Sequence, residues 1–264
     1  MVEFSSTFVC AGTLIAPKVV LTAAACLTSA PGTVFVNLYV ITNLADVEII
    51  NAGPDNYVIH PDYNTPRLAN NVALIILEND VTNADTIQYP KLNEESDEPA
   101  DGDPLLVMGW GTTSYGGVLS NVLLQAQLDY MTNDVCSSIY DPNDVVITDG
   151  TICAAKDGKD VCQGDGGGPL MLNNANSNLR TNPVQVGISS WTTGCAADTD
   201  LPSGYARPTN SKSSKTTKRT KAEKITIRAS LNKSGASCYH GPGTAMGVVL
   251  ALNIAFLAIT GVVL

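Results

Sequence analysis

Short apolar runs alternate along most of the chain with segments rich in Gly, Pro, Asn and Asp. The runs are β-branched or apolar and have the length of a strand: VVLTAAA (19–25), VFVNLYVIT (34–42), VALIIL (72–77), PLLVMGW (104–110) and VQVGISSW (184–191). Such runs, separated by turn-forming residues, are typical of β-strands. No long amphipathic helix pattern interrupts them. The pattern therefore predicts an all-β protein.

The segment 208–244 has a different composition. It is rich in Ser, Thr and Lys and contains eight basic residues against a single Glu, a net charge of +7, whereas the whole chain of 264 residues carries −10 and the remainder −17. A basic run can bind nucleic acid or anionic lipid. No aromatic residue precedes Tyr239 in this segment. We therefore favour a solvated linker or stalk and expect no nucleic-acid partner.

The final segment, 245–264, is apolar and long enough to span a bilayer. A small-residue triplet, Ser234-Gly235-Ala236, stands a short polar spacer before it, which is the arrangement of a glycosylphosphatidylinositol signal with Ser234 as attachment residue. A C-terminal membrane helix is the rival interpretation, weakened by Asn253 and other interruptions, and a buried soluble helix is third. The only glycosylation sequon begins at Asn232, beside the proposed attachment residue.

Several motifs occur in an order that matches a known family. The stretch CQGDGGGPL (162–170) differs by one residue, Gly166, from CQGDSGGPL, the string around the nucleophile of chymotrypsin-like serine proteases. The other motifs are GTLIAPKVVLTAAACL (12–27), NNVALIIL (70–77), MGWGTTSYGG (108–117), TICAAKDGKDVC (151–162), SSWTTGCA (189–196) and PSGYARP (202–208). Over nearly all of residues 9–208, the chain is identified as a member of the trypsin/chymotrypsin family.

This resemblance implies a fold of two packed antiparallel six-stranded β-barrels. The expected boundaries are 1–94 for the N-terminal barrel and 95–207 for the C-terminal barrel, joined through the acidic segment 93–104. Because Met1 falls inside the family's first barrel, we expect its N-terminal strand to be missing or altered. The family's C-terminal helix should begin near Pro208, where no helical pattern appears, so we expect that helix to be missing or replaced by the stalk.

All three positions of the family's catalytic triad carry other residues. Ala25 stands where the family has the general-base His, Asn71 where it has the orienting Asp, and Gly166 where it has the nucleophilic Ser. Acyl transfer needs all three side chains, and losing the nucleophile alone costs roughly a factor of 10⁶. The oxyanion-hole N–H groups, carried by Gly164 and Gly166, persist. The substitutions predict a protein that is not an enzyme.

Two other imidazoles are available as substitute bases. His60 lies in HPDY, a surface-loop signature of the family, and His240 lies in the C-terminal segment. Neither position suggests a hydrolase. No cofactor and no metal site are expected.

The family's specificity pocket is also altered. Asp160 occupies the floor position that receives Lys or Arg, but Thr192 and Ser203 stand where the walls are usually Gly. The assignment of Ser203 leaves a slip of one residue open, because SGY differs from the family's GVY. We prefer a buried acid satisfied by Ser and Thr hydroxyls over residual binding of a basic side chain. The remaining pocket positions are Ser190, Trp191 and Gly194.

Seven cysteines indicate an oxidising compartment. Six cysteines allow fifteen pairings, which spacing alone does not reduce. The resemblance implies Cys10–Cys26, Cys136–Cys153 and Cys162–Cys195, leaving Cys238 as a free thiol or as part of a removed segment. The start MVEFSSTFVC lacks a signal peptide, which we expect upstream of Met1, together with the family's activation site. We expect a secreted protein, with attachment to the cell surface through its C-terminal segment.

Members of the family with eroded triads act by binding other proteins. One such group, the glucanase inhibitor proteins of plant-pathogenic oomycetes, looks especially close, and GGVLSNVLLQ (116–125) and VCSSIYD (135–141) resemble oomycete trypsin-like sequences. The leading hypothesis is a non-catalytic homologue that inhibits a secreted host endo-β-1,3-glucanase, a glycoside hydrolase. The alternatives are an adhesive or regulatory protease homologue at the cell surface and a weak trypsin-like hydrolase.

Overall fold

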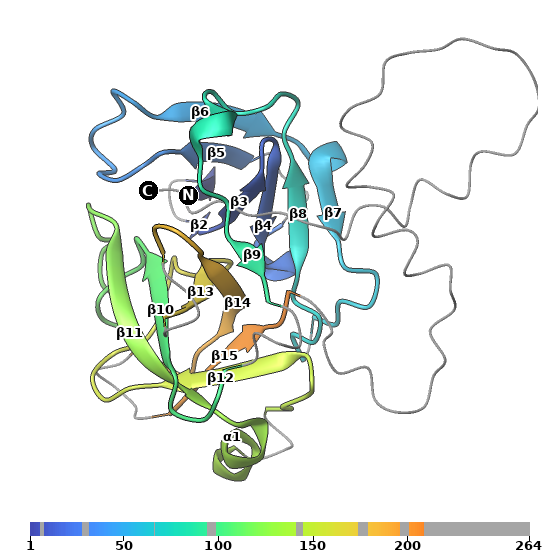
Figure 1. Ribbon diagram of the computed structural model, residues 1–264, viewed down its shortest axis with the longest axis vertical. Helices are drawn as coiled ribbons and strands as arrows, with labels where there is room; N and C mark the ends of the chain where they lie inside the picture. The colour runs from blue at the N-terminus through green and yellow to red at the C-terminus, as the bar shows by residue number, and fades with distance from the viewer. Residues whose placement is uncertain are drawn as a thin grey trace, which may run out of the picture. The chain divides into compact units, whose positions relative to one another are not determined.

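The computed structural model describes residues 1–5, 8–27, 32–65, 67–93, 99–140, 145–173, 179–195 and 201–208. These residues are almost entirely β-structure, as the apolar runs predicted (Figure 1). They contain a single α-helix, α1 (Asn133–Ile139), and three 3₁₀ turns, η1 (Ala24–Cys26), η2 (Pro54–Asn56) and η3 (Ala84–Thr86).

The C-terminal half is a closed barrel of six antiparallel strands. Around the barrel these are β13 (Pro169–Leu172), β10 (Pro104–Gly109), β11 (Leu124–Met131), β12 (Thr151–Ala155), β15 (Ser203–Ala206) and β14 (Val184–Trp191), and β13 pairs with β14 to close it. A short strand, β9 (Lys91–Leu92), adds to β14 in parallel. The interior is filled by fully buried side chains that include Leu105, Leu128, Ile152 and Tyr205.

The N-terminal half consists of two four-stranded sheets around one core. The first sheet has the order β2 (Phe8–Cys10), β1 (Val2–Ser5), β5 (Gly32–Val36) and β6 (Glu48–Ala52), and the second has β3 (Thr13–Ala16), β4 (Val19–Thr22), β8 (Ala73–Ile76) and β7 (Tyr57–Ile59). Leu14, Leu38 and Ile75 lie in their shared core, and Trp110 from the other half completes it.

Two extended segments pass from the first of these sheets to the second. β2 and β3 are separated only by Ala11 and Gly12, and β6 and β7 only by the turn around η2. Gly12 suits the first corner because a Cβ there would lie 2.8 Å from Val20 Cγ1. Eight short strands therefore form six extended segments, the number expected for this barrel, with bends where a segment changes sheet.

One sequence expectation about this half is corrected. The first strand, expected to be missing or altered, is present as β1, which pairs antiparallel with both β2 and β5. The run 34–42 also ends as a strand earlier than expected, at Val36. Asn37 has φ of 60°, a left-handed conformation that ends the extended run.

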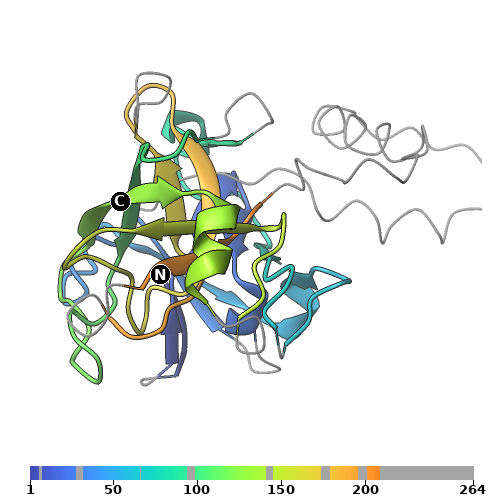
Figure 2. The same ribbon diagram turned by 90° about the horizontal axis from the view of Figure 1, so that it is seen from below.

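The helix α1 lies at the outer end of the C-terminal barrel, next to β12 (Figures 1 and 2). Its buried Cys136 forms a disulfide with Cys153 of β12, which fixes the helix to the barrel.

The expectations about the C-terminal segment lie outside the described residues. They concern the C-terminal helix near Pro208, the linker 208–244, the tail 245–264, Asn232, Ser234 and Cys238. Within the residues that the structure describes, no helix combines the length and the apolar character needed to cross a membrane.

Candidate functional site

A groove of about 740 Å³ lies between residues of the two halves. Its volume falls in the range of ordinary ligand sites. The N-terminal half contributes Val9, Cys10, Ala23, Ala25 and Cys26. The C-terminal half contributes a larger set, which includes Tyr115, Leu119, Gly164, Gly166, Ser190, Trp191, Thr192 and Gly194. Ala25 and Gly166, two of the three triad positions, therefore share one groove with Gly164.

Asn71, the third triad position, does not line the groove and makes hydrogen bonds to both halves. Its side chain is fully buried. Its Oδ1 accepts a hydrogen bond from the Ala25 N–H at 2.8 Å, and its Nδ2 donates to Ser190 Oγ at 2.8 Å. An amide suits this position because it accepts on one side and donates on the other without placing a charge in the interior. Asn71 is thus a structural bridge between η1 and β14.

Ala25 and Gly166 present no reactive side chain to the groove. Ala25 is exposed at the groove surface. A Cβ added to Gly166 would lie 3.9 Å from the sulfurs of the Cys10–Cys26 disulfide, so the space for a small side chain is open. The Gly166 carbonyl accepts a hydrogen bond from Ala11 N–H at 2.8 Å, which fixes the loop against β2.

The described imidazole lies away from the groove. His60 is not among the groove residues, and its Nδ1 accepts a hydrogen bond from the Asp62 N–H at 3.1 Å. Burial lowers the pKa of His60, an effect that the nearby Asp62 carboxylate opposes. His240 lies outside the described residues. Among the described residues, no imidazole lines the groove to activate a nucleophile at position 166.

The four consecutive amides from Gly164 to Gly167 divide into two pairs. The Asp165 N–H donates to Cys162 O at 3.0 Å and the Gly167 N–H to Ser189 O at 2.9 Å. The N–H groups of Gly164 and Gly166 donate to no acceptor among the described residues. Gly164 and Gly167 have φ of 100° and 82°, so the loop needs glycine at both positions.

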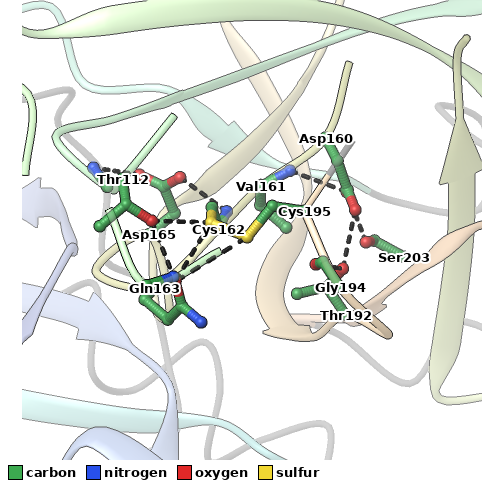
Figure 3. The surroundings of a disulfide bond; sticks show 12 residues. Thr112, Asp160, Val161, Cys162, Gln163, Asp165, Thr192, Gly194, Cys195 and Ser203 are labelled. Atoms are coloured by element: carbon green, nitrogen blue, oxygen red, sulfur yellow. Dashed lines mark hydrogen bonds between the residues drawn. A yellow bond between two sulfur atoms is a disulfide. The ribbon is translucent and has the colours of Figure 1, made fainter. Parts of the chain in front are cut away.

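The Asp165 carboxylate is turned inward, between backbone amides. Its Oδ1 accepts from Gly111 N–H at 2.8 Å and its Oδ2 from Cys162 N–H at 3.0 Å (Figure 3). Burial raises the pKa of Asp165 to about 6, although these two hydrogen bonds act to lower it. No Lys or Arg pairs with it in the part of the chain that the structure describes.

Asp160, the pocket-floor residue, is covered by hydroxyls (Figure 3). Thr192 Oγ1 donates to its Oδ2 at 2.7 Å, Ser203 Oγ donates to its Oδ1 at 2.5 Å, and the Val161 N–H donates to the same oxygen at 2.7 Å. Burial raises the pKa of Asp160, and these hydrogen bonds partly offset the rise. Asp160 itself is not among the residues lining the groove. Ser203 therefore contacts the acid at the pocket floor, as Thr192 does.

Of the remaining pocket positions, Trp191 contacts Tyr140 and β15. Its ring meets Tyr140 edge to face, with centroids 5.3 Å apart. Gly204, opposite it on β15, leaves room for the indole, since a Cβ there would overlap with Trp191 Cε2. The Gly194 carbonyl lies 2.6 Å from Thr192 Oγ1, so that hydroxyl shares its single proton between this carbonyl and Asp160.

The three disulfides that the resemblance implied are present. Cys10–Cys26 and Cys162–Cys195 border the groove, and Cys136–Cys153 lies beside α1. Sequence reasoning named the motif 108–117 but did not place it at the groove, where Tyr115 lies with a side chain 72% exposed; Val118, three residues later, is 87% exposed. The sequence signal for this exposed loop is the presence of Tyr115 and Val118 among Gly and Ser residues.

Comparison with known proteins agrees with this geometry. The chain matches the family Trypsin over residues 1–214. It is 33% identical over 198 residues to a vitellin-degrading protease of Bombyx mori, covering 74% of this chain and 70% of the relative. It is also 33% identical over 194 residues to a trypsin of Sarcophaga bullata, covering 71% and 70%. The chain belongs to the trypsin family.

Proposed function

We propose that this protein is a non-catalytic member of the trypsin family that acts by binding another protein. The observation that supports it is the groove itself. Its walls carry Ala25 and Gly166 where a base and a nucleophile are needed, and Asn71 serves as a structural bridge. A site without a nucleophile and without a base lacks the parts of acyl transfer that act as a unit.

Activity measurements test the non-catalytic part of the proposal. The disulfide-intact protein should neither cleave amides after Lys or Arg nor react with serine-directed fluorophosphonates. Labelling that disappears on heat unfolding would establish an active hydroxyl and refute the proposal. The unpaired N–H groups of Gly164 and Gly166 are the one feature that favours the second candidate, a weak hydrolase, because such donors retain roughly 10³-fold catalysis over water.

A protein partner is supported by the surface beside the groove. Tyr115 and Trp191 line the groove, and Val118, which is exposed, follows the lining residue Gly117 in the chain. Aromatic side chains are enriched in protein interfaces because they bury a large area at small entropic cost. The three disulfides require an oxidising compartment, so the partner is a secreted or surface protein.

We propose a host endo-β-1,3-glucanase as that partner, which the protein binds and inhibits. This identification rests on the resemblance of the triad-depleted sequence to the glucanase inhibitor proteins of oomycetes. Immobilised protein should capture a glucanase from host extracellular fluid, and adding the free protein should slow hydrolysis of a β-1,3-glucan. Capture of a protease, or of nothing, would favour the adhesive or regulatory alternative.

A matched pair of variants locates the interface. The double variant Tyr115→Ser/Val118→Ser removes the exposed apolar side chains beside the groove and should weaken capture at least tenfold. Leu44→Ser, which removes an exposed apolar side chain that does not line the groove, should leave capture unchanged. Equal capture by all three proteins would place the interface elsewhere.

We also propose that the protein is held on the outer cell surface by a lipid anchor attached at Ser234. The support is the small-residue triplet, the polar spacer and the apolar segment 245–264 in the sequence. Phosphatidylinositol-specific phospholipase C should release the protein from intact cells without residues 245–264. Extracted protein that retains this segment would indicate a transmembrane helix instead.

A further inference from the structure

The connection between β5 and β6 (Figure 1), residues 37–47, lines a cavity that shares no lining residue with the groove. The volume of this cavity is about 460 Å³, within the range of small-molecule sites. We infer that the cavity binds a neutral oligosaccharide, with one pyranose ring stacked on Tyr39. The inference goes beyond the proposed function and does not depend on it, because it concerns a different part of the surface.

The lining of the cavity has the chemistry that a sugar needs. A pyranose has a face of C–H groups that packs on an aromatic ring, and an edge of hydroxyls that form hydrogen bonds with amides and carboxylates. One aromatic ring, two small apolar side chains, two amides and one carboxylate line the cavity: Tyr39, Val40, Val47, Asn37, Asn43 and Asp46. This set therefore matches both the face and the edge of a pyranose.

The backbone of Tyr39 is fixed while its side chain faces solvent. Its carbonyl accepts hydrogen bonds from the Leu123 N–H at 2.8 Å and from Trp110 Nε1 at 3.3 Å. The preceding residue, Leu38, is fully buried, whereas Tyr39 is 57% exposed. A ring held out on a fixed backbone loses little conformational freedom on binding. Tyr39 is thus a preorganised platform for a ligand.

Asn37 closes the loop and shapes the cavity. It has φ of 60°, and its Nδ2 donates to the Asp46 carbonyl at 3.1 Å, which joins the two ends of the loop. Between these ends the Asn43 N–H donates to Val40 O at 2.9 Å. Val47 packs against the core of the N-terminal half. The lining side chains are therefore held by hydrogen bonds and by packing before any ligand binds.

Several polar atoms of the lining have no partner among the described residues. The Asp46 carboxylate and the Tyr39 hydroxyl make no hydrogen bond or ion pair within that part of the chain. Asn37 Oδ1 accepts from no described residue, and Asn43 Nδ2 donates to none. Donors and acceptors are thus available at one cavity. Sugar hydroxyls can satisfy both kinds, because each hydroxyl donates and accepts.

The charge of the lining excludes other small ligands. None of the described residues that line the cavity is Lys or Arg, and Asp46 repels an anion. Asp46 is also the only acid among them, whereas calcium takes about six to eight oxygen ligands, several of them from carboxylates. An apolar ligand would leave the amides and the carboxylate unpaired. A neutral ligand with many hydroxyls remains, and the cavity is larger than one pyranose ring.

A titration with neutral and charged sugars tests the inference. The ¹⁵N-labelled protein, disulfides intact, is titrated separately with maltotriose, cellotriose, laminaritriose and triacetylchitotriose, and with the anionic trigalacturonic acid. We expect at least one neutral trisaccharide to shift the amide resonances of residues 37–47 at millimolar concentration. This sugar should bind at least tenfold more tightly than trigalacturonic acid. No shift in this loop with any neutral sugar, or tighter binding of the acid, would overturn the inference.

Two variants of Tyr39 test the stacking. Tyr39→Leu keeps an apolar side chain but removes the flat ring, and it should weaken binding of the best trisaccharide at least tenfold. Tyr39→Phe keeps the ring and loses only the hydroxyl, so it should weaken binding less than threefold. Both variants should fold, because the side chain is largely exposed. Equal affinities of the two variants would show that no sugar ring stacks on residue 39.

A matched pair of acids tests the polar edge of the site. Asp46→Ala removes the carboxylate but leaves the backbone carbonyl that accepts from Asn37, and it should weaken binding of the same trisaccharide at least fivefold. Asp55→Ala removes an exposed carboxylate from η2 that does not line the cavity, and it should leave the affinity unchanged. Equal affinities of these two variants would contradict the inference.

Discussion

Asp160 and Asp165 lie on either side of the Cys162–Cys195 disulfide, and they are satisfied in opposite ways (Figure 3). Asp160 depends on side chains, because the Thr192 and Ser203 hydroxyls donate to it alongside one backbone amide. Asp165 depends on the backbone alone, through the N–H groups of Gly111 and Cys162. Hydroxyl donors are lost by a single substitution, whereas backbone donors are lost only when the chain is displaced.

The two arrangements have different consequences, one for ligand binding and the other for folding. The hydroxyls that satisfy Asp160 belong to Thr192 and Ser203, and we expect the same two side chains both to stabilise the acid and to exclude a long cationic ligand. The amides that satisfy Asp165 require glycine neighbours, and they hold the loop that carries Gly164 and Gly166. Substitutions around Asp160 should therefore alter binding, and substitutions around Asp165 should alter folding.

The largest expected effect comes from crowding Asp165. In Gly111→Ala the new Cβ would overlap with Asp165 Cγ and Oδ2. Because this contact displaces the backbone donor itself, we expect the free energy of unfolding to fall by about 3 kcal/mol. Urea unfolding measures it. The control is Gly53→Ala, whose Cβ would have its nearest contact at 4.0 Å and which should change stability by less than about 1 kcal/mol. Equal losses of stability in the two variants would mean that the Asp165 side chain moves aside at little cost.

The pH dependence of stability should show the cost of the Asp165 charge. Burial raises the pKa of this carboxyl from 3.8 to about 6 in the folded protein. A raised pKa means that the folded state binds the proton more tightly than the unfolded state, so this contribution to stability falls as pH rises from about 4 to above 6. A pKa change of this size corresponds to about 3 kcal/mol.

Denaturant unfolding at pH 4.5 and 7.5, in the unmodified protein and in Asp165→Asn, isolates that contribution. Asn lacks the charge, so its stability should change less between the two pH values, even though it also loses an acceptor at both. An identical pH dependence in the two proteins would assign the effect to other carboxyl groups.

Next in size is the loss of one hydroxyl at Asp160. Thr192→Val keeps the shape of the side chain but removes the donor to Asp160 Oδ2. Hydrogen bonds to charged groups contribute about 1.5–3 kcal/mol, and we expect a loss of about 1.5 kcal/mol at pH 7. Thr33→Val on β5, whose hydroxyl meets the neutral Asn51, is the matched control, with a loss under about 0.5 kcal/mol. Equal losses would show that Asp160 gains nothing from Thr192.

The same hydroxyls predict a change in ligand binding. Unmodified protein should not bind benzamidine, a flat cationic probe, at millimolar concentration. The double variant Thr192→Gly/Ser203→Gly widens the pocket and leaves Asp160 with one backbone donor, and it should bind the probe measurably by calorimetry. Binding by the unmodified protein would restore the alternative in which Asp160 receives a basic side chain.

Each of the five apolar runs contains or overlaps a strand, namely β4, β5, β8, β10 and β14. The motifs also pointed to Ala25 and Gly166, which line one groove, because motifs fix residue identity and order. It did not predict the corner between β2 and β3 or the end of β5 at Asn37, since both depend on backbone dihedral angles. The double role of Asn71 was also missed. Its partners, Ala25 and Ser190, lie 46 and 119 residues away along the chain, and only the fold brings them to the two ends of one amide.

The smallest expected effect on stability comes from Gly166→Ser. The same variant tests whether a hydroxyl at this position is enough to restore amide cleavage. The new Cβ meets only the disulfide sulfurs at 3.9 Å, so stability should change by less than about 0.5 kcal/mol. No turnover should follow, because a Ser hydroxyl without a base is a weak nucleophile.

Adding Ala25→His and Asn71→Asp supplies the base and its partner, and the carboxylate introduced at position 71 can still accept from the backbone N–H of residue 25. The triple variant should nevertheless cleave arginyl amides poorly, since Thr192 and Ser203 continue to cover Asp160. Trypsin-like rates in the triple variant would show that the pocket, and not only the triad, is intact.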